Sequence, residues 1–150
     1  MARRNEAFDR VRDVERQAEA LSFAAARLLA AAGRNPALLK TNDFDERDLR
    51  TAAAELRRTY LIRLFSEFEG VLRDYWRNGV GRPTRPNIEV LIERVAARRG
   101  AESAVVAGVH AVRALRNDLV HAPAPPEKMP PIADARRRLC RFLARLPPRW

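Results

Sequence analysis

The stretch 103–123, SAVVAGVHAVRALRNDLVHAP, decides the fold, and we interpret the rest of the chain around it. Gly100 and Ser103 mark the start of a helix that we expect to reach about residue 122, and Pro123 ends it. At about 100° per residue, most valines and leucines fall on one broad arc and the alanines fall opposite. Because neither side resembles a solvated face, the pattern predicts a helix that other helices cover on more than one side.

The few polar side chains of this helix gather along one edge and at its end. Four of them form a ridge beside the apolar arc: His110, Arg113, Asn117 and His121. Arg116 falls inside the arc, where a guanidinium is costly unless an anion meets it. We therefore expect a functional site here, with Glu69 of an earlier helix as the candidate anion. For His110 a packing role is the preferred interpretation.

Residues 116–121, RNDLVH, have the form Arg-x4-His with a polar residue directly after the arginine. Over about residues 43–146 the chain resembles the HEPN (higher eukaryotes and prokaryotes nucleotide-binding) domain family. The resemblance rests on this motif, on its place at the end of a late helix and on the long helix around 60–69 (YLIRLFSEFE). The resemblance implies an all-α, up-down bundle of four to five helices. It also implies that Arg116 binds phosphate, that Asn117 is the adjacent polar residue and that His121 is catalytic.

The resemblance implies an activity as well, because many family members are metal-independent endoribonucleases of toxin or host-defence type. Cleavage would leave 2′,3′-cyclic phosphate and 5′-hydroxyl ends. The reaction needs both a base and an acid, whereas each chain has one motif histidine, so we expect a homodimer that joins two motifs in one composite site. The expected partners are RNA, a second copy and an antitoxin protein. One branch of the family is controlled through a tyrosine two places after the histidine, where this chain has Pro123, so we expect no such control.

Composition agrees with a single helical domain over residues 1–150. Hydrophobic residues make up 47% of the chain and charged residues 32%, which suits a folded protein with one core. The formal net charge of +10 favours polyanions, nucleic acid first and anionic membrane second. Nearly all of this charge is arginine, which suits bidentate phosphate contacts, although genomic composition explains the same bias.

Cysteine and histidine usage limits the chemistry. Cys140 is the only cysteine, which excludes a disulfide within the chain and a site of several thiolates. The two histidines lie eleven places apart, a spacing that does not supply a zinc site, so we expect neither a metal nor a cofactor. No apolar run approaches about 18 residues. We expect a cytoplasmic protein that does not engage a membrane.

The first half of the chain predicts two long helices. The first runs from about residue 5 to 32, with an apolar stripe at steps of three and four that includes Leu21 and Leu28. Asp43 and Glu46 resemble a capping box that opens a second helix reaching about residue 77. Unbroken, this helix would be about 50 Å long, so we expect a bend or break near Thr51.

The second half predicts a short helix, the motif helix and a last helix. Asn87 caps the short helix and Gly100 closes it. A proline-rich linker, 123–131, leads to the last helix at about 132–146. The turn 79–86, GVGRPTRP, carries Arg82 and Arg85, which we interpret either as a plain loop or as an RNA contact. Two further candidate RNA contacts precede it, Arg73 and Arg77.

Two other functions remain open. A non-catalytic HEPN-like module would use the same groove to hold RNA, a nucleotide or a protein. A basic helical DNA-binding protein is less favoured, because no helix-turn-helix pair with a recognition helix stands out.

Overall fold

The computed structural model describes residues 3–124 and 129–150. Within these residues the regular structure is helical, and no strand is present. The α-helices are α1 (Arg4–Arg34), α2 (Glu46–Asp74), α3 (Ile88–Arg99), α4 (Ser103–His121) and α5 (Ile132–Leu143). Two short turns join them, the 3-10 turn η1 (Pro36–Leu39) and the π-helical turn η2 (Tyr75–Gly79). The expected all-α bundle of four to five helices is confirmed.

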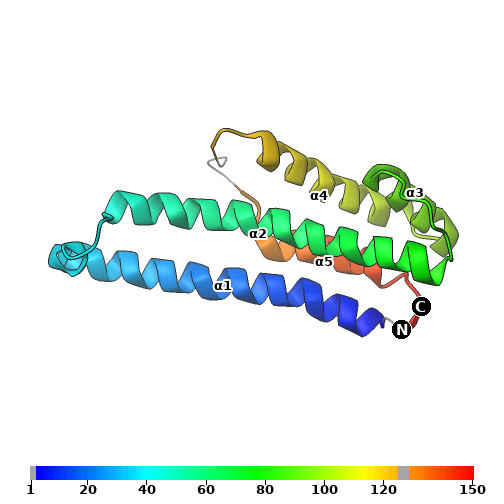
Figure 1. The fold of residues 1–150 in the computed structure, drawn as a ribbon, viewed down its shortest axis with the longest axis horizontal. Coiled ribbons are helices and arrows are strands. Elements are labelled where there is room, and N and C mark those ends of the chain that lie inside the picture. Colours follow the sequence, from blue (N-terminus) through cyan, green and yellow to red (C-terminus); the bar gives the residue numbers. More distant parts are fainter. Residues whose placement is uncertain (1–2, 125–128) are drawn as a thin grey trace.

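A long antiparallel hairpin of α1 and α2 is the frame of the molecule (Figure 1). Helices α4 and α5 pack only on the half of this hairpin that lies near the two chain ends, and α3 lies beside the start of α4. The other half, around the turn from α1 to α2, extends beyond the bundle without a covering helix. The motif at the end of α4 therefore lies near the boundary between the covered and the bare half.

The hydrophobic core lies in the covered half. It combines side chains of the first half of α1 with those of α2, α3, α4 and α5, and its largest fully buried side chains include Phe65, Phe68 and Phe142. The rings of Phe68 and Phe142 meet edge to face with centroids 5.8 Å apart, which joins α2 to α5. The sequence pattern of the long second helix thus predicts its central position correctly.

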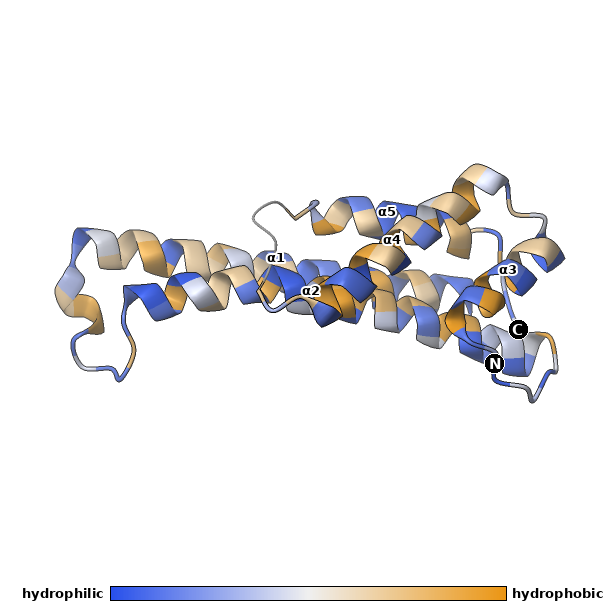
Figure 2. Ribbon diagram, turned by 90° about the horizontal axis from the view of Figure 1, so that it is seen from above, coloured by the Kyte–Doolittle hydropathy of each residue, from blue (hydrophilic) through white to orange (hydrophobic). Residues whose placement is uncertain are grey.

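The bare half departs from the sequence expectation. Leu21 and Leu28 continue the apolar stripe of α1, and we expected both in the core, but they are 43% and 36% exposed. The reason is tertiary, because α4 and α5 are too short to reach this part of the hairpin (Figure 1). Figure 2 shows that hydrophobic segments continue into this part of the hairpin.

The second helix also starts and continues differently from our expectation. Its capping box is formed by Asp45 and Asp48, each accepting a hydrogen bond of 3.0 Å from the other's backbone N–H, and not by Asp43 and Glu46. The predicted bend near Thr51 is wrong, since α2 is unbroken over 29 residues, or about 44 Å. The Thr51 hydroxyl donates to the carbonyl of Arg47 within the helix.

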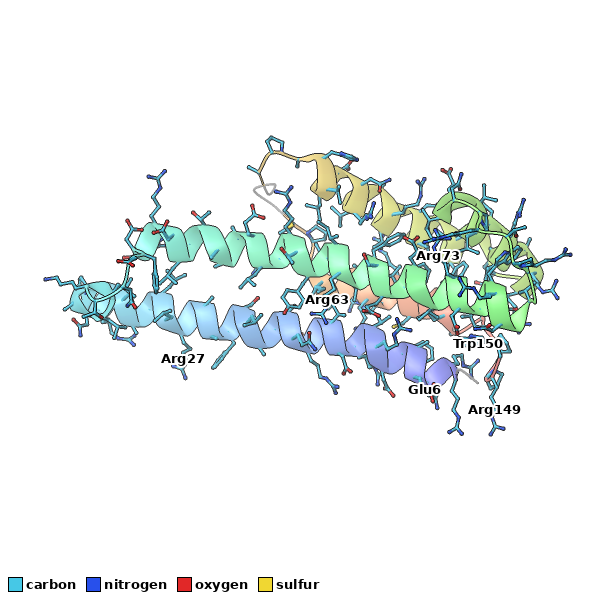
Figure 3. All side chains as sticks on the ribbon, viewed as in Figure 1. Glu6, Arg27, Arg63, Arg73, Arg149 and Trp150 are labelled. Atoms are coloured by element: carbon cyan, nitrogen blue, oxygen red, sulfur yellow. The ribbon has the colours of Figure 1, made fainter. Side chains whose placement is uncertain are left out.

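The last residues of the chain lock the two ends together. The Arg4 side chain donates to the carbonyls of Ala144 and Leu146, and its backbone N–H donates to Pro148. Trp150 follows and lies beside the start of α1 and the end of α2 (Figure 3). Its indole N–H donates to Asp74 at 2.7 Å. This closure fixes where α5 lies against the hairpin.

The predicted linker and last helix are partly described. Pro125 and Pro126 fall outside the described residues, and Pro131 is the N-cap of α5. The helix ends at Leu143, three residues before the expected end, although Leu146 is still buried. Within the described ranges, no helix has the length and apolar character needed to cross a membrane.

Candidate functional site

The motif lies at the end of α4, which packs against α2, α3 and α5. The C-cap Ala122 is extended (φ −69°, ψ 134°), as expected for a residue before proline. The start of α4 differs from our expectation, because Glu102 is the N-cap and Ser103 is the first helical residue. The Glu102 carboxylate makes no cap hydrogen bond and pairs with Arg145 at 2.8 Å.

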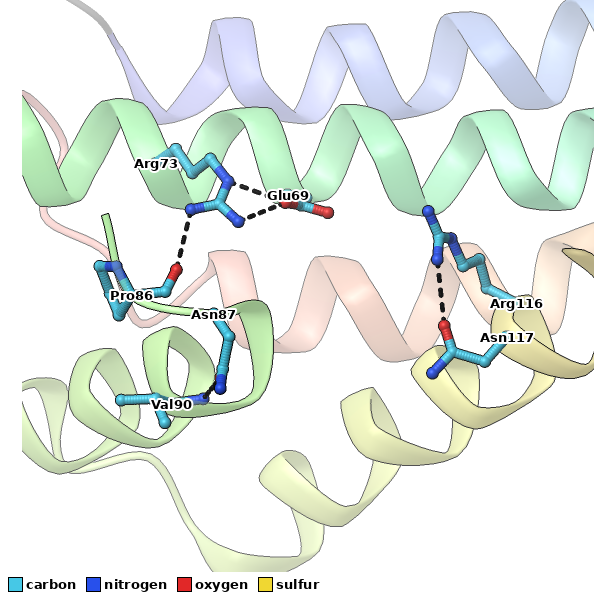
Figure 4. A network of polar contacts seen from close by, with 7 residues as sticks. All are labelled: Glu69, Arg73, Pro86, Asn87, Val90, Arg116 and Asn117. Atoms are coloured by element: carbon cyan, nitrogen blue, oxygen red, sulfur yellow. Dashed lines mark hydrogen bonds and ion pairs between the residues drawn. The ribbon is translucent and has the colours of Figure 1, made fainter.

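Arg116 and Asn117 contact each other directly. The Arg116 Nη1 donates to the Asn117 Oδ1 at 3.0 Å, and both side chains are half-buried (Figure 4). The Arg116 Nε is buried and has no hydrogen-bond partner among the described residues. No carboxylate of residues 3–124 or 129–150 forms an ion pair with this guanidinium. Its positive charge is therefore oriented by a neutral amide and not neutralised.

The expected partner of Arg116, Glu69, is engaged elsewhere. The Glu69 carboxylate accepts from the Arg73 Nε at 2.7 Å and lies 2.6 Å from its Nη2 (Figure 4). Arg73 follows Glu69 by four residues on the same helix, the spacing at which side chains meet. It is also held by the carbonyl of Pro86 at 3.1 Å. The predicted pairing of Glu69 with Arg116 is therefore wrong, and Glu69 and Arg73 fix the loop before α3.

Two further polar residues of the predicted ridge, His110 and Arg113, join α4 to α3. The His110 Nε2 lies 2.6 Å from the Glu93 carboxylate, and the Arg113 Nη2 lies 3.3 Å from the Glu89 carboxylate. Both α4 side chains are partly buried by these contacts. The packing role preferred for His110 agrees with this contact, and Arg113 has the same role.

His121 is the last residue of α4 and is exposed. A residue that our sequence reasoning missed supports this helix end: the Arg58 Nη2 donates to the carbonyl of Ala122 at 2.6 Å. Arg58 lies on α2, and its Nη1 is 3.5 Å from the Glu55 carboxylate. No motif in the sequence singles out Arg58, because its contact is 64 residues away along the chain.

The secondary RNA-contact candidates do not lie with the motif. Arg77, Arg82 and Arg85 are exposed near the end of α2, on the side of the bundle where α4 begins, whereas His121 lies where α4 ends (Figure 1). The guanidinium of Arg73 is bound to Glu69 and to the carbonyl of Pro86. Arg116 and Asn117 contact each other, His121 follows them at the end of the same helix without a contact to either among the described residues, and the other arginines lie apart.

The outward face of α4 is small and uncharged over most of its length. After Ser103, its exposed side chains before the motif are Ala104, Ala107, Ala111 and Ala114. Val120, which helix periodicity placed on the buried arc, is 41% exposed. This face and the helix end offer little steric hindrance to a neighbouring molecule.

In the described part of the chain, no group of three or more histidine, cysteine, aspartate or glutamate side chains is placed to hold a metal ion. Comparison with known proteins gives no further guide: no family model, no curated protein and no solved structure matches this chain.

Proposed function

We propose that this protein is a metal-independent endoribonuclease whose active site is made by the Arg-x4-His motifs of two chains. Arg116 binds the scissile phosphate, Asn117 orients the Arg116 guanidinium and His121 transfers protons. The proposal combines the resemblance to the HEPN family with the local geometry of α4.

The observation that carries the proposal is the unpaired guanidinium of Arg116. Its neighbours Arg113 and Arg58 both contact carboxylates, of Glu89 and Glu55, whereas Arg116 is held by Asn117 alone among the described residues. A half-buried cation without a counter-ion is costly and favours binding of an anion. The non-bridging oxygens of a phosphodiester match the planar fork of an arginine.

The chemistry needs no group beyond those of the motif. The ribose 2′-oxygen attacks phosphorus as its proton passes to a base, and the bond from phosphorus to the 5′-oxygen breaks as that oxygen accepts a proton from an acid. Arg116 stabilises the charge that develops on the phosphoryl oxygens. Histidine suits both proton transfers, since its ordinary pKa lies near neutrality.

Two features support the use of two chains. His121 is exposed at a helix end, so the same residue of a second chain has access to one phosphate from the other side. The alanines of the outward face of α4 permit close approach of a symmetric copy. One histidine then acts as the base and the other as the acid.

The test is cleavage of single-stranded RNA by purified protein in excess EDTA. We expect His121→Ala and Arg116→Ala to abolish cleavage and to leave the helical circular dichroism spectrum unchanged. The chain offers matched controls on the same helix: His110→Ala and Arg113→Ala remove the same side-chain types from contacts with α3. These controls should keep most of the activity.

The outcomes separate the possible functions. Equal cleavage by the wild type and His121→Ala would overturn the proposal, and RNA binding without cleavage would favour the non-catalytic module. Wild-type chain mixed with rising amounts of His121→Ala chain should lose activity more steeply than dilution predicts. Activity in strict proportion to the wild-type chain would exclude the composite site. A toxin-type role, with a dedicated antitoxin, predicts growth arrest on expression of the wild type but not of His121→Ala.

A further inference from the structure

The bare half of the α1–α2 hairpin carries most of the large hydrophobic side chains that are exposed among the described residues. Of the six large hydrophobic side chains that are exposed, five belong to this half and to its turn: Leu21, Phe23, Leu28, Leu38 and Phe44. The sixth, Val120, lies at the end of α4. Apolar side chains gathered in one region of a surface mark an interaction site.

Two of the exposed side chains of α1, Leu21 and Leu28, belong to an apolar series of regular spacing, whereas Phe23 lies on another face of the helix. Leu21, Ala24, Leu28 and Ala31 succeed one another at alternating steps of three and four, which places them on one stripe of the helix. Toward the bundle the same spacing continues through Gln17, Val14 and Arg10: Gln17 and Arg10 are polar and exposed, and Val14 is buried in the core.

On α2 a second stripe with the same spacing runs beside the first. It consists of Leu49, Ala52, Leu56 and Thr59, and it is bounded by Asp45 toward the turn and by Arg63 toward the bundle. We call these two stripes together the distal seam. The two stripes lie on the same face of the hairpin. The α1 stripe, extended toward the bundle, reaches Arg10, and the Arg10 Nη2 lies 2.7 Å from the Glu67 carboxylate of α2.

The distal seam faces away from α5. Figures 1 and 2 place α5 behind the hairpin when the molecule is viewed as in Figure 1, and α1 contacts it through Glu15, which pairs with Arg136 at 2.6 Å. At 100° per residue, Glu15 lies about 120° around α1 from Leu21 and about 140° from Leu28. Among the described residues, the seam is therefore not covered by α5, although Leu56 is partly buried against the core.

Charge separates this half from the rest of the chain. Residues 19–57 contain six basic and six acidic side chains, so their net charge is zero and the remainder carries the whole +10. Two copies of this protein repel each other through their basic bundles but not through their hairpins. The hairpin is the region where self-association costs the least electrostatic energy.

We propose that the distal seam binds the distal seam of a second copy of this chain, forming an antiparallel four-helix bundle. A two-fold axis that crosses the hairpin places α2 against the partner's α2 in opposite direction. Asp45 of each chain then lies opposite the other copy's Arg63, at both ends of the seam. The parallel arrangement would instead place the acidic turns of both copies together, among them Asp43, Asp45 and Asp48.

The area available for this contact is that of a small interface, so we expect a weak association that depends on protein concentration. The uncovered length from residue 19 to residue 34 is about 24 Å, and two helices side by side are about 20 Å wide, which gives about 480 Å² on each copy. The sum over both copies, about 960 Å², is near the lower bound of about 1,000 Å² for specific interfaces. Because the bundles lie at opposite ends of such a dimer, they do not collide. The contact is separate from the motif-to-motif association, since Arg58, which contacts the end of α4, is not part of the seam.

Light scattering of the full-length protein over a range of concentrations tests the proposal. The wild type should be larger than the 17.0 kDa monomer, and the double variant Leu21→Lys/Leu28→Lys should have a lower mass than the wild type at every concentration, because it keeps only the association through the motif. Both leucines are already substantially exposed, so the variant should keep the helical circular dichroism spectrum. The melting temperature of the wild type should rise with protein concentration more than that of the variant.

Charge reversal tests the antiparallel register. Arg63→Glu should weaken the association about tenfold in low salt, and high salt should remove most of this difference. Arg57→Glu makes the same change on the same helix outside the seam and should leave the mass unchanged. A monomeric wild type, or a leucine variant of wild-type mass, would overturn the seam proposal. If Arg57→Glu weakened the association as much as Arg63→Glu, the antiparallel register would be contradicted.

Discussion

Replacing Trp150 should destabilise the fold by an amount that its contacts allow us to work out. The indole N–H donates to the Asp74 Oδ2 at 2.7 Å, and a hydrogen bond to a charged acceptor contributes about 1.5–3 kcal/mol. The ring also meets Tyr75 edge to face with centroids 5.6 Å apart, which adds about 0.5–1.5 kcal/mol. We expect Trp150→Phe to lose mainly the hydrogen bond and Trp150→Ala to lose both, about 2–4 kcal/mol in total.

Urea unfolding measures these losses as shifts of the midpoint at constant slope. A double-mutant cycle of Trp150→Phe and Asp74→Ala isolates the pair, because Asp74 also accepts from Asn78 and that loss cancels in the cycle. We expect a coupling free energy of about 1–2 kcal/mol. A coupling near zero, or an unfolding free energy that Trp150→Ala leaves unchanged, would refute this account of how the chain ends are locked.

At Gly79 we expect a glycine-to-alanine substitution to change stability in the direction opposite to the usual one. Glycine to alanine within a helix ordinarily stabilises by about 1 kcal/mol. A Cβ at Gly79 would lie 2.6 Å from the Tyr75 Cδ2 and 2.7 Å from the Trp150 Cβ, so one of these side chains must move. Gly79→Ala should therefore destabilise by about 1–3 kcal/mol. A more stable Gly79→Ala protein in the same urea assay would show that Trp150 does not pack as described.

Three shorter predictions concern other contacts. Burial raises the pKa of the Cys140 thiol above its usual 9.0, so iodoacetamide should modify native protein more slowly than unfolded protein. The neutral thiol also contributes stability that should decline as the pH rises above 9. The Cys140→Ala protein should not show this decline. Glu15→Gln weakens a mostly buried ion pair with Arg136 and should cost about 1–2 kcal/mol in thermal unfolding; an unchanged melting temperature would contradict this. Arg58→Ala removes the donor to the Ala122 carbonyl and should lower RNA cleavage while the unfolding free energy falls by about 1 kcal/mol; unaltered cleavage would show that this contact does not position the motif.

Local signals in the sequence predicted the elements whose ends are set locally. Asn87 caps α3 by accepting from the Val90 N–H at 2.9 Å, and Gly100 ends it with a left-handed φ of 61°. Both roles depend on side-chain or backbone properties of a single residue, so they are visible without the fold. The position of α4 was likewise predictable from its apolar arc and from Pro123.

Long-range arrangement set the features that the sequence did not predict. Leu21 and Leu28 have the spacing of core residues, but whether another helix reaches them depends on the lengths of α4 and α5. Trp150 gave no signal either, because its partners Asp74 and Tyr75 lie more than seventy residues earlier in the chain. Periodicity indicates which face is apolar, and it does not indicate what covers that face.

The candidate site shows the same limit for charge. Helix periodicity correctly placed Arg116 on a partly buried face. It did not indicate which of two arginines, Arg73 or Arg116, pairs with the Glu69 carboxylate, because that depends on distances in the folded structure. Arg73 has the shorter path, one helical turn on the same helix, and is held by a second acceptor, so it takes the carboxylate. Arg116 is left with an amide partner. Failure of the predicted ion pair therefore strengthens the case for an external anion, because a guanidinium already neutralised by Glu69 would have less to gain from a phosphate.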